Sequence, residues 1–132
     1  MAQPNWSHGT TLEATPISAS EARAFVSHHL VDYRLLDLVE SVRLVVSELA
    51  TNALVHGQTP FVVTLSSEDD SVRLTVQDDS DWIASRGPGQ VLLGSGRGLR
   101  IVDMLSRDWG VVIAPGSTTV WALFDARRRS SP

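Results

Sequence analysis

The chain has 132 residues, of which 42% are hydrophobic and 20% are charged, and this fits one globular domain with a buried core. Its net charge of −4 argues against sequence-independent nucleic-acid binding, and the absence of cysteine excludes disulfides and thiolate chemistry. Because the sequence has neither a signal-peptide pattern nor an apolar stretch of membrane-spanning length, we expect a cytoplasmic protein without membrane contact.

Polar segments at both ends bracket the domain. We predict a disordered segment over residues 1–10, a domain over residues 11–125 and a disordered tail over residues 126–132. Residues 10–14 could form a short edge strand at the start of the domain, closed by the proline that follows.

Two helices are expected next. Ser18 or Ser20 offers an N-cap for a first helix that ends near residue 31. A second, longer helix is predicted over residues 35–56, with Gly57 as its C-terminal stop. Its apolar residues recur at helical spacing and form one stripe: Leu38, Val42, Val45, Val46, Leu49 and Ala53.

Beyond the long helix the hydrophobic period changes to that of strands. Residues 61–65 and 72–76 are β-rich runs separated by a polar turn, which is a hairpin signature. Residues 78–96 then lose regularity over a stretch too long for an ordinary connection, which indicates a functional segment.

The chain closes with a third helix and a second hairpin. Leu99, Val102 and Leu105 define the buried face of this helix, and residues 109–113 and 119–124 are strands that flank a Pro-Gly turn. The order of elements predicts an α+β fold, a two-layer sandwich with helices on one face of a mostly antiparallel sheet.

Three groups of residues could carry chemistry, and the first lies on the long helix. Glu48, Asn52 and His56 are spaced four residues apart and share one polar strip. An amide oxygen suits a hydrated Mg²⁺ ion, and a carboxylate can orient or deprotonate a nucleophile. The alternative for this strip alone is an exposed helical face.

The second group is a glycine-rich run, residues 94–98, that leads into the third helix. Glycines let the backbone approach phosphates, and a helix N-terminus directs N–H groups and a positive dipole at them; the alternative is a flexible loop before a helix. The chain has no lysine, which excludes a P-loop. A dinucleotide-binding fold is disfavoured because the next strand ends at Ala114 and Pro115, without an acidic residue.

The third group is Asp78, the first acidic residue after the strand at residues 72–76. A carboxylate at a strand end can accept a hydrogen bond from the amino group of a base. Asp79 and Asp81 crowd beside it, so the alternative is an acidic turn.

These groups occur in a fixed order that resembles a known family. Residues 47–57 (SELATNALVHG) resemble the N-box of the gyrase, heat-shock chaperone, histidine-kinase and mismatch-repair ATPase superfamily, most of all the branch of anti-sigma-factor serine/threonine kinases. Residues 96–103 resemble the second glycine box of that branch, and residues 109–121 its terminal hairpin, as in many small actinobacterial members. The likeness covers residues 12–124 and implies a Bergerat-type ATP-binding fold with ATP and Mg²⁺ as cofactors.

The resemblance implies roles for individual residues. Glu48 would be the general base, and Asn52 would ligate Mg²⁺, with His56 on the same strip near the nucleotide. Asp78 would read the adenine amino group, and Thr119 would place a hydroxyl near the adenine.

The glycine run would wrap the phosphates in such a protein. The residues assigned to this part of the site are Gly94, Gly96, Arg97, Gly98 and Leu99. Arg97 could touch a phosphate or face solvent, and residues 79–93 would form a lid over ATP.

One motif departs from the family. The first glycine box usually reads D-x-G-x-G, whereas residues 78–82 read Asp-Asp-Ser-Asp-Trp. Replacement of both glycines predicts a rebuilt lid or weak ATP binding.

Two functions follow as hypotheses. The first is an ATP-dependent protein kinase that phosphorylates a serine or threonine of an antagonist protein and controls a sigma factor by partner binding. The second is a non-catalytic, nucleotide-responsive interaction module with a degenerate ATP site. A homodimer formed through the sheet edge or the N-terminal region is also expected, with Trp6, Phe25 and Tyr33 as contacts unless they pack within the chain.

The histidines suggest no further function. A histidine-kinase interpretation lacks an upstream helical hairpin, and His28 and His29 are expected to be a surface residue and a half-buried residue of the first helix. The four histidines show no spacing typical of metal ligands.

Overall fold

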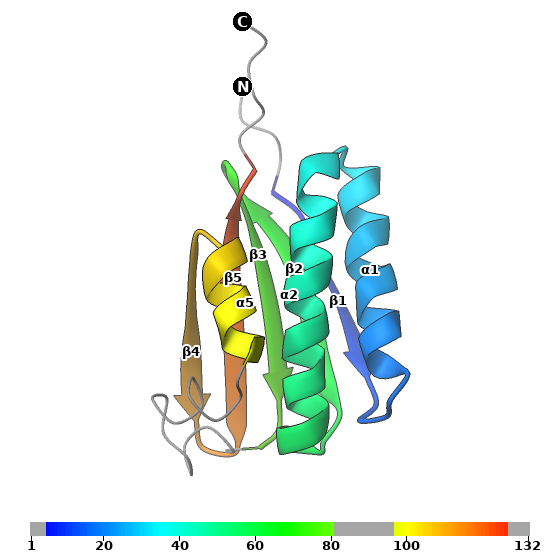
Figure 1. Ribbon diagram of the computed structural model, residues 1–132, viewed down its shortest axis with the longest axis vertical. Helices are drawn as coiled ribbons and strands as arrows, with labels where there is room; N and C mark the ends of the chain where they lie inside the picture. Colours follow the sequence, from blue (N-terminus) through cyan, green and yellow to red (C-terminus); the bar gives the residue numbers. More distant parts are fainter. Residues whose placement is uncertain (1–4, 81–96, 127–132) are drawn as a thin grey trace, which may run out of the picture.

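The sheet is antiparallel throughout and has the strand order β1-β2-β3-β5-β4 (Figure 1). The computed structural model describes residues 5–80 and 97–126, and within these ranges the strands are β1 (Ser7–Leu12), β2 (Phe61–Glu68), β3 (Ser71–Asp78), β4 (Asp108–Ala114) and β5 (Ser117–Asp125). The two predicted hairpins are confirmed as β2–β3 and β4–β5.

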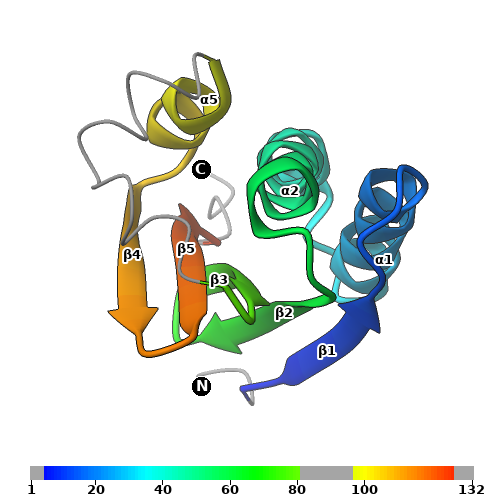
Figure 2. The same cartoon turned by 90° about the horizontal axis from the view of Figure 1, so that it is seen from below.

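The helices lie on one face of this sheet (Figure 2). They are α1 (Ser18–Asp32), the short 3₁₀ helix η1 (Leu36–Leu38), α2 (Val39–Asn52), the π-helical turn η2 (Ala53–Gly57) and α5 (Arg97–Leu105). This arrangement confirms the predicted α+β, two-layer class. None of the helices in the described part of the chain combines the length and apolarity needed to cross a membrane.

The core fills the space between the helices and the sheet. Alternate residues of the central strands point toward the helices and are buried: Phe61, Val63, Leu65, Val72, Leu74, Val76, Val120, Ala122 and Phe124. The predicted apolar stripe of α2 meets them through Val42, Val45, Val46 and Leu49. On α5, Leu99 and Val102 are fully buried as predicted, and Leu105 packs against the same cluster.

The expectation of disorder over residues 1–10 is wrong for its second half, because Ser7–Leu12 form the edge strand β1. Aromatic contacts with α1 and the residue after it explain this order. Trp6 stacks on Tyr33 with ring centroids 4.1 Å apart, and His8 both stacks on His29 at 4.0 Å and hydrogen-bonds the Tyr33 hydroxyl at 2.8 Å. Burial, then the neighbouring His8 and His28, lower the pKa of His29.

The first helix begins at Ser18, but no serine caps it. The N-cap position is Ile17, which makes no side-chain capping bond, and the Ser18 hydroxyl instead donates to the Thr15 carbonyl at 2.7 Å. As expected, His28 is exposed and His29 half-buried.

The long helix predicted over residues 35–56 is not continuous. A 3₁₀ turn at Leu36–Leu38 precedes α2, and the regular helix ends at Asn52, where the π-helical turn η2 begins. The helical stop is Gln58, with a left-handed φ of 56°, and not Gly57 as predicted.

Both ends of the described chain meet at the β2–β3 turn. The Asp69 amide donates to Asn5 Oδ1 at 3.3 Å, and the Ala126 amide donates to the Asp70 carbonyl at 2.7 Å. Asp69 has a φ of 52°, as tight hairpin turns require.

Candidate functional site

The polar strip of α2 continues into η2 at one end of the molecule. Glu48 and His56 are half-buried, whereas Asn52 is 8% exposed. The Asn52 Nδ2 atom is buried and has no hydrogen-bond partner among the described residues. An unpaired buried amide costs about 1–3 kcal/mol, so it marks a position where a ligand or its water completes the bonding.

The π-helical turn brings Gly57 against the end of β3. The Gln58 amide bonds the Ala53 carbonyl at 3.0 Å, five residues back, which widens the last turn. A Cβ atom on Gly57 would lie 2.9 Å from Asp78 Oδ2 and 3.1 Å from its Cγ. Glycine is therefore required here by close approach and not by a left-handed backbone.

Asp78 ends β3 on the helix side of the sheet and is 3% exposed. Its Oδ1 accepts two hydrogen bonds from Ser80, from the amide at 2.9 Å and from the hydroxyl at 2.6 Å. The next amide, that of Asp79, donates to Thr59 Oγ1 at 3.2 Å. Ser80, which stands where the family pattern has its first glycine, thus tightens the turn around the carboxylate.

The threonine beside Asp78 is Thr118 and not Thr119. Thr118 pairs with Asp78 across β3 and β5, is 1% exposed, and donates its hydroxyl to the Ser80 carbonyl at 2.8 Å. Thr119 pairs with Gln77, so its side chain points to the opposite face of the sheet. Thr119, which was predicted to place a hydroxyl near the adenine, therefore lies one residue out of register with the side of the sheet that carries Asp78.

The start of α5 lies at the same end of the molecule as η2 and the end of β3 (Figure 1). Helix α5 follows the glycine-rich run as predicted, but it begins at Arg97, so that Arg97 and Gly98 already belong to its first turn. The Leu99 side chain is 1% exposed in the core, which leaves its backbone for any phosphate contact. Gly94, Gly96 and most of the predicted lid lie outside the described residues.

A comparison with models of protein families identifies the family to which this domain belongs. Residues 12–124 match the model of the histidine kinase-like ATPase domain. The chain belongs to this family. The matched range is the one over which the N-box, the glycine box and the terminal hairpin were identified. A comparison with curated proteins gives no match.

A solved structure agrees with this assignment to the histidine kinase-like ATPase family. The fold is similar to that of the RsbU and RsbW domains of Rv1364c from Mycobacterium tuberculosis, with a TM-score of 0.68 and 21% identity. The match covers 91% of this chain and 32% of the other, so the chain spans less than half of that protein's length. At this identity the likeness shows the fold alone.

The residues of this ATPase-family domain fit a nucleotide with Mg²⁺. A buried amide at Asn52, whose Nδ2 has no hydrogen-bond partner among residues 5–80 and 97–126, and a buried carboxylate at Asp78 lie on elements that converge at one end, and Gly57 lets helix and strand approach closely there. Amide and carboxylate oxygens are the protein ligands that Mg²⁺ accepts.

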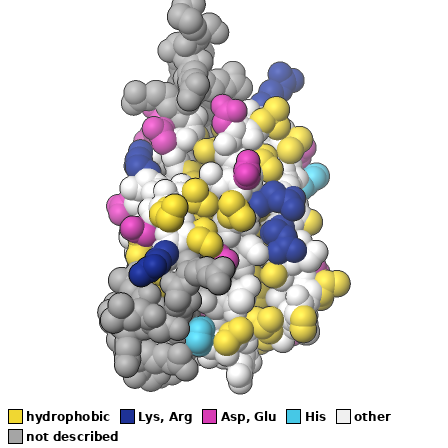
Figure 3. Space-filling view, in the orientation of Figure 1, with side chains coloured by type: hydrophobic (Ala, Val, Ile, Leu, Met, Phe, Trp, Pro, Cys, Tyr) yellow, Lys and Arg dark blue, Asp and Glu magenta, His cyan; other side chains and the backbone are white. Residues whose placement is uncertain are grey.

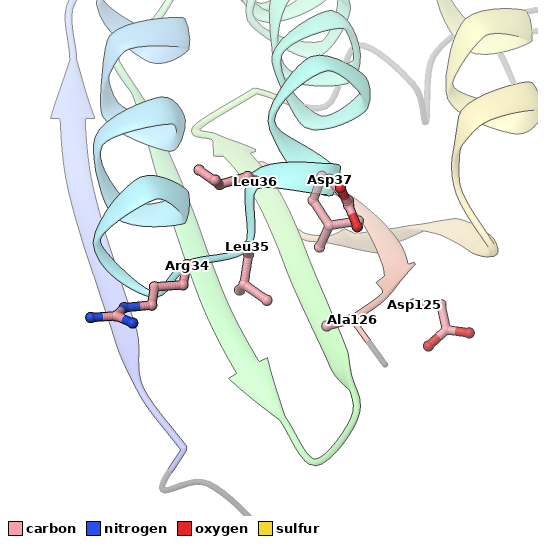
Figure 4. Close-up of a pocket in the computed structure, with 7 residues that line it drawn as sticks. Arg34, Leu35, Leu36, Asp37, Asp125 and Ala126 are labelled. Atoms are coloured by element: carbon pink, nitrogen blue, oxygen red, sulfur yellow. The ribbon is translucent and has the colours of Figure 1, made fainter. Parts of the chain in front are cut away.

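Two hollows of the family domain lie away from these residues. One, of about 250 Å³, lies where the chain passes from α1 to α2 beside the end of β5, with Leu35, Asp37 and Asp125 among its lining residues (Figure 4). The other, of about 310 Å³, is a groove lined by Arg23, Glu40, Arg43, Leu44 and Ser47. Basic side chains gather over α1 and α2 on this face of the molecule (Figure 3).

Proposed function

We propose that this domain binds Mg²⁺-ATP between the end of α2 and the start of α5 and transfers the γ-phosphate to a serine or threonine of an antagonist protein. Through partner binding it would control a sigma factor. The observation that carries the proposal is the buried Asn52 amide, whose Nδ2 finds no hydrogen-bond partner in the part of the chain that the structure describes, while Asp78 is held at the end of β3. The similarity to a structure with an RsbW domain fits the same branch of the family.

Two residues of α2 would serve the phosphate end. Asn52 would ligate Mg²⁺ through its side-chain oxygen, and the burial of this residue, which is 8% exposed, would hold that oxygen in place. Bound Mg²⁺ would neutralise charge on the β- and γ-phosphates. Glu48, one helical turn earlier and half-buried, would accept the proton of the attacking hydroxyl.

Asp78 would bind the adenine end. Its carboxylate can accept from an exocyclic amino group, and the Ser80 and Thr118 hydroxyls fix the turn that carries it.

The partner would dock on the groove between α1 and α2. Arg23 donates to Ser47 Oγ at 2.9 Å and Arg43 to Ser27 Oγ at 3.0 Å, and neither forms an ion pair with any carboxylate in residues 5–80 or 97–126. Leu44, 48% exposed, lies in the same groove. Two guanidinium groups beside an exposed leucine suit an acidic, partly apolar protein segment.

Isothermal titration with ATP tests the nucleotide site directly. We expect binding that requires Mg²⁺ and is lost in Asn52→Ala. The matched control is Gln77→Ala, which removes an exposed amide on the opposite face of β3 and should leave affinity unchanged. Absence of binding at millimolar ATP, or equal binding by Asn52→Ala, would overturn the proposal.

The second candidate is a non-catalytic module that responds to ATP. The bonding of Ser80 to Asp78, in place of the family's first glycine, favours it because the tightened turn changes the adenine end of the site. Glu48→Gln separates the two candidates. A kinase would lose phosphotransfer to its protein substrate, by a factor of about 10²–10⁴ expected for a general base, while retaining ATP binding. If wild type and Glu48→Gln both bind ATP and neither labels any protein substrate, the module is the correct description.

A further inference from the structure

Three side chains that can bind a metal ion converge near the C-terminal end of α1. The ligand atoms of His28, His29 and Asp32 all lie within 4.8 Å of one another, and His28 Nε2 lies 3.4 Å from Asp32 Oδ2. The spacing of His28 and Asp32 is i,i+4, which places both on one helical face. The spacing of the four histidines in the sequence did not indicate this group, because its third member is the aspartate Asp32.

The distance between the ligand atoms of His28 and Asp32 matches the spacing of ligands around a metal ion with tetrahedral coordination. Ligands about 2.1 Å from a tetrahedral Zn²⁺ ion lie about 3.4 Å from each other, which is the separation of His28 Nε2 and Asp32 Oδ2. The side chains of these two residues are 68% and 60% exposed, so rotation can close the remaining distance to His29 at little cost.

The His29 side chain is the one of the three that ring packing holds in place. Its ring is stacked on His8 of β1 at 4.0 Å and 11°, and Phe25 meets it edge-on at 4.8 Å and 72°. Such packing holds the imidazole in one orientation before a metal arrives, which lowers the ordering cost of binding.

We propose that His28, His29 and Asp32 form a binding site for one divalent transition-metal ion, with Zn²⁺ as the best fit. Two imidazoles and one carboxylate favour Zn²⁺, Co²⁺ or Ni²⁺, whereas Mg²⁺ and Ca²⁺ prefer oxygen-only shells. A water completes the tetrahedron. The site lies at the end of α1 remote from η2 and the end of β3 (Figure 1), so it is separate from the proposed Mg²⁺ position at Asn52.

Bound metal should also stabilise the contact between α1 and β1. His29 is both a ligand and the stacking partner of His8, so fixing its ring fixes the surface on which β1 rests. A ligand that binds only the folded chain raises the melting temperature in proportion to the logarithm of its concentration.

The test is titration of the tag-free chain with ZnCl₂ by calorimetry, in a non-chelating buffer at about pH 7.5. We expect one Zn²⁺ per chain, a rise in melting temperature, and the visible absorption of tetrahedral Co²⁺ when cobalt replaces zinc. Both His28→Gln and Asp32→Asn should lower the affinity for Zn²⁺ about tenfold or more. Even the loss of a residue that only hydrogen-bonds a metal ligand lowers metal affinity by about that factor. Because both side chains are exposed, these variants should fold normally.

Glu21→Gln is the control, because it removes an exposed acid from the first turn of the same helix. Its affinity for Zn²⁺ should equal that of the wild type. No heat and no thermal shift at millimolar Zn²⁺ would overturn the proposal. So would binding that survives in the double variant His28→Gln/Asp32→Asn, because the ligands would then lie elsewhere.

Discussion

Gly57 is the point where the helix layer touches the candidate site most closely. Its Cα faces the Asp78 carboxylate across a gap that admits no further carbon atom. The carboxylate is short, buried and bonded to Ser80, so it cannot move aside as the tip of a flexible surface side chain would.

Gly57→Ala should therefore destabilise the protein although alanine is the better helix former. Overpacking costs about 1–3 kcal/mol, and helix propensity returns up to about 1 kcal/mol, so we expect a net loss of about 1–2 kcal/mol. Urea denaturation measures it. The control is Gly9→Ala in β1, where an added Cβ would meet its nearest atom at an ordinary 3.5 Å and the stability should barely change. Equal losses of unfolding free energy in Gly57→Ala and Gly9→Ala would contradict the close approach of Gly57 to Asp78.

Ser80 donates two hydrogen bonds to Asp78 Oδ1. In the proposed site these bonds compete with the one that the adenine amino group would donate to the same carboxylate. Ser80→Ala removes the 2.6 Å hydroxyl bond and keeps the backbone restrained. If one such bond is worth about 0.5–1.5 kcal/mol, ATP affinity should rise about two- to twelvefold. Calorimetric titration in Mg²⁺ measures the change. A fall in affinity would mean that the hydroxyl holds the carboxylate in its binding position.

Ser80→Gly is the companion variant, because it also restores the family's glycine. A larger gain in Ser80→Gly than in Ser80→Ala would assign the difference to backbone freedom of the turn. Equal gains would assign the whole effect to the hydroxyl.

At the scale of the secondary-structure elements, β1 is held to the helix layer by side-chain contacts. It is an edge strand paired only with β2 in the described sheet, and aromatic rings tie it to the end of α1. The three aromatic residues considered for a dimer contact, Trp6, Phe25 and Tyr33, make ring contacts within the chain.

Trp6→Ala should release this strand. The ring is half-buried, so we expect a loss of about 1–3 kcal/mol of unfolding free energy, below the 3–5 kcal/mol of a fully buried tryptophan. Hydrogen exchange should quicken at β1 amides and stay unchanged in α2. Ser7→Ala, an exposed neighbour on the other face of the strand, should change neither quantity. Uniformly faster exchange across the sheet would contradict a local role.

Most elements could be predicted from the sequence because each has one buried face. Period-two alternation marked β2, β3 and β5, and helical spacing marked α2 and α5. Two features depended on tertiary contacts and could not be predicted in this way. They are the order of β1, which depends on ring contacts with α1 and Tyr33, and the π-helical turn, which lies where Gly57 meets β3. The position of Thr118 beside Asp78 could have been predicted, because Thr118 shares the alternation of Val120, Ala122 and Phe124.

In the molecule as a whole, sheet order places the candidate site at one end. The end of β3, the start of β5, η2 and the start of α5 meet there, although they come from distant parts of the sequence (Figure 1). The sequence could identify Glu48, Asn52 and Asp78 as candidates because their motifs are local. It could not show that Asn52 is buried and that its Nδ2 has no partner among the described residues, because burial is a property of the assembled layers.

The meeting of Asn5 and Ala126 at the β2–β3 turn has a consequence for protein engineering. Two ends anchored to neighbouring residues, Asp69 and Asp70, can be joined by a short linker, and new termini can then be opened at the β4–β5 turn around Gly116. A fluorescent reporter or a neighbouring domain fused at the original ends would be attached at the end of the molecule opposite the end of β3 (Figure 1), away from the candidate site.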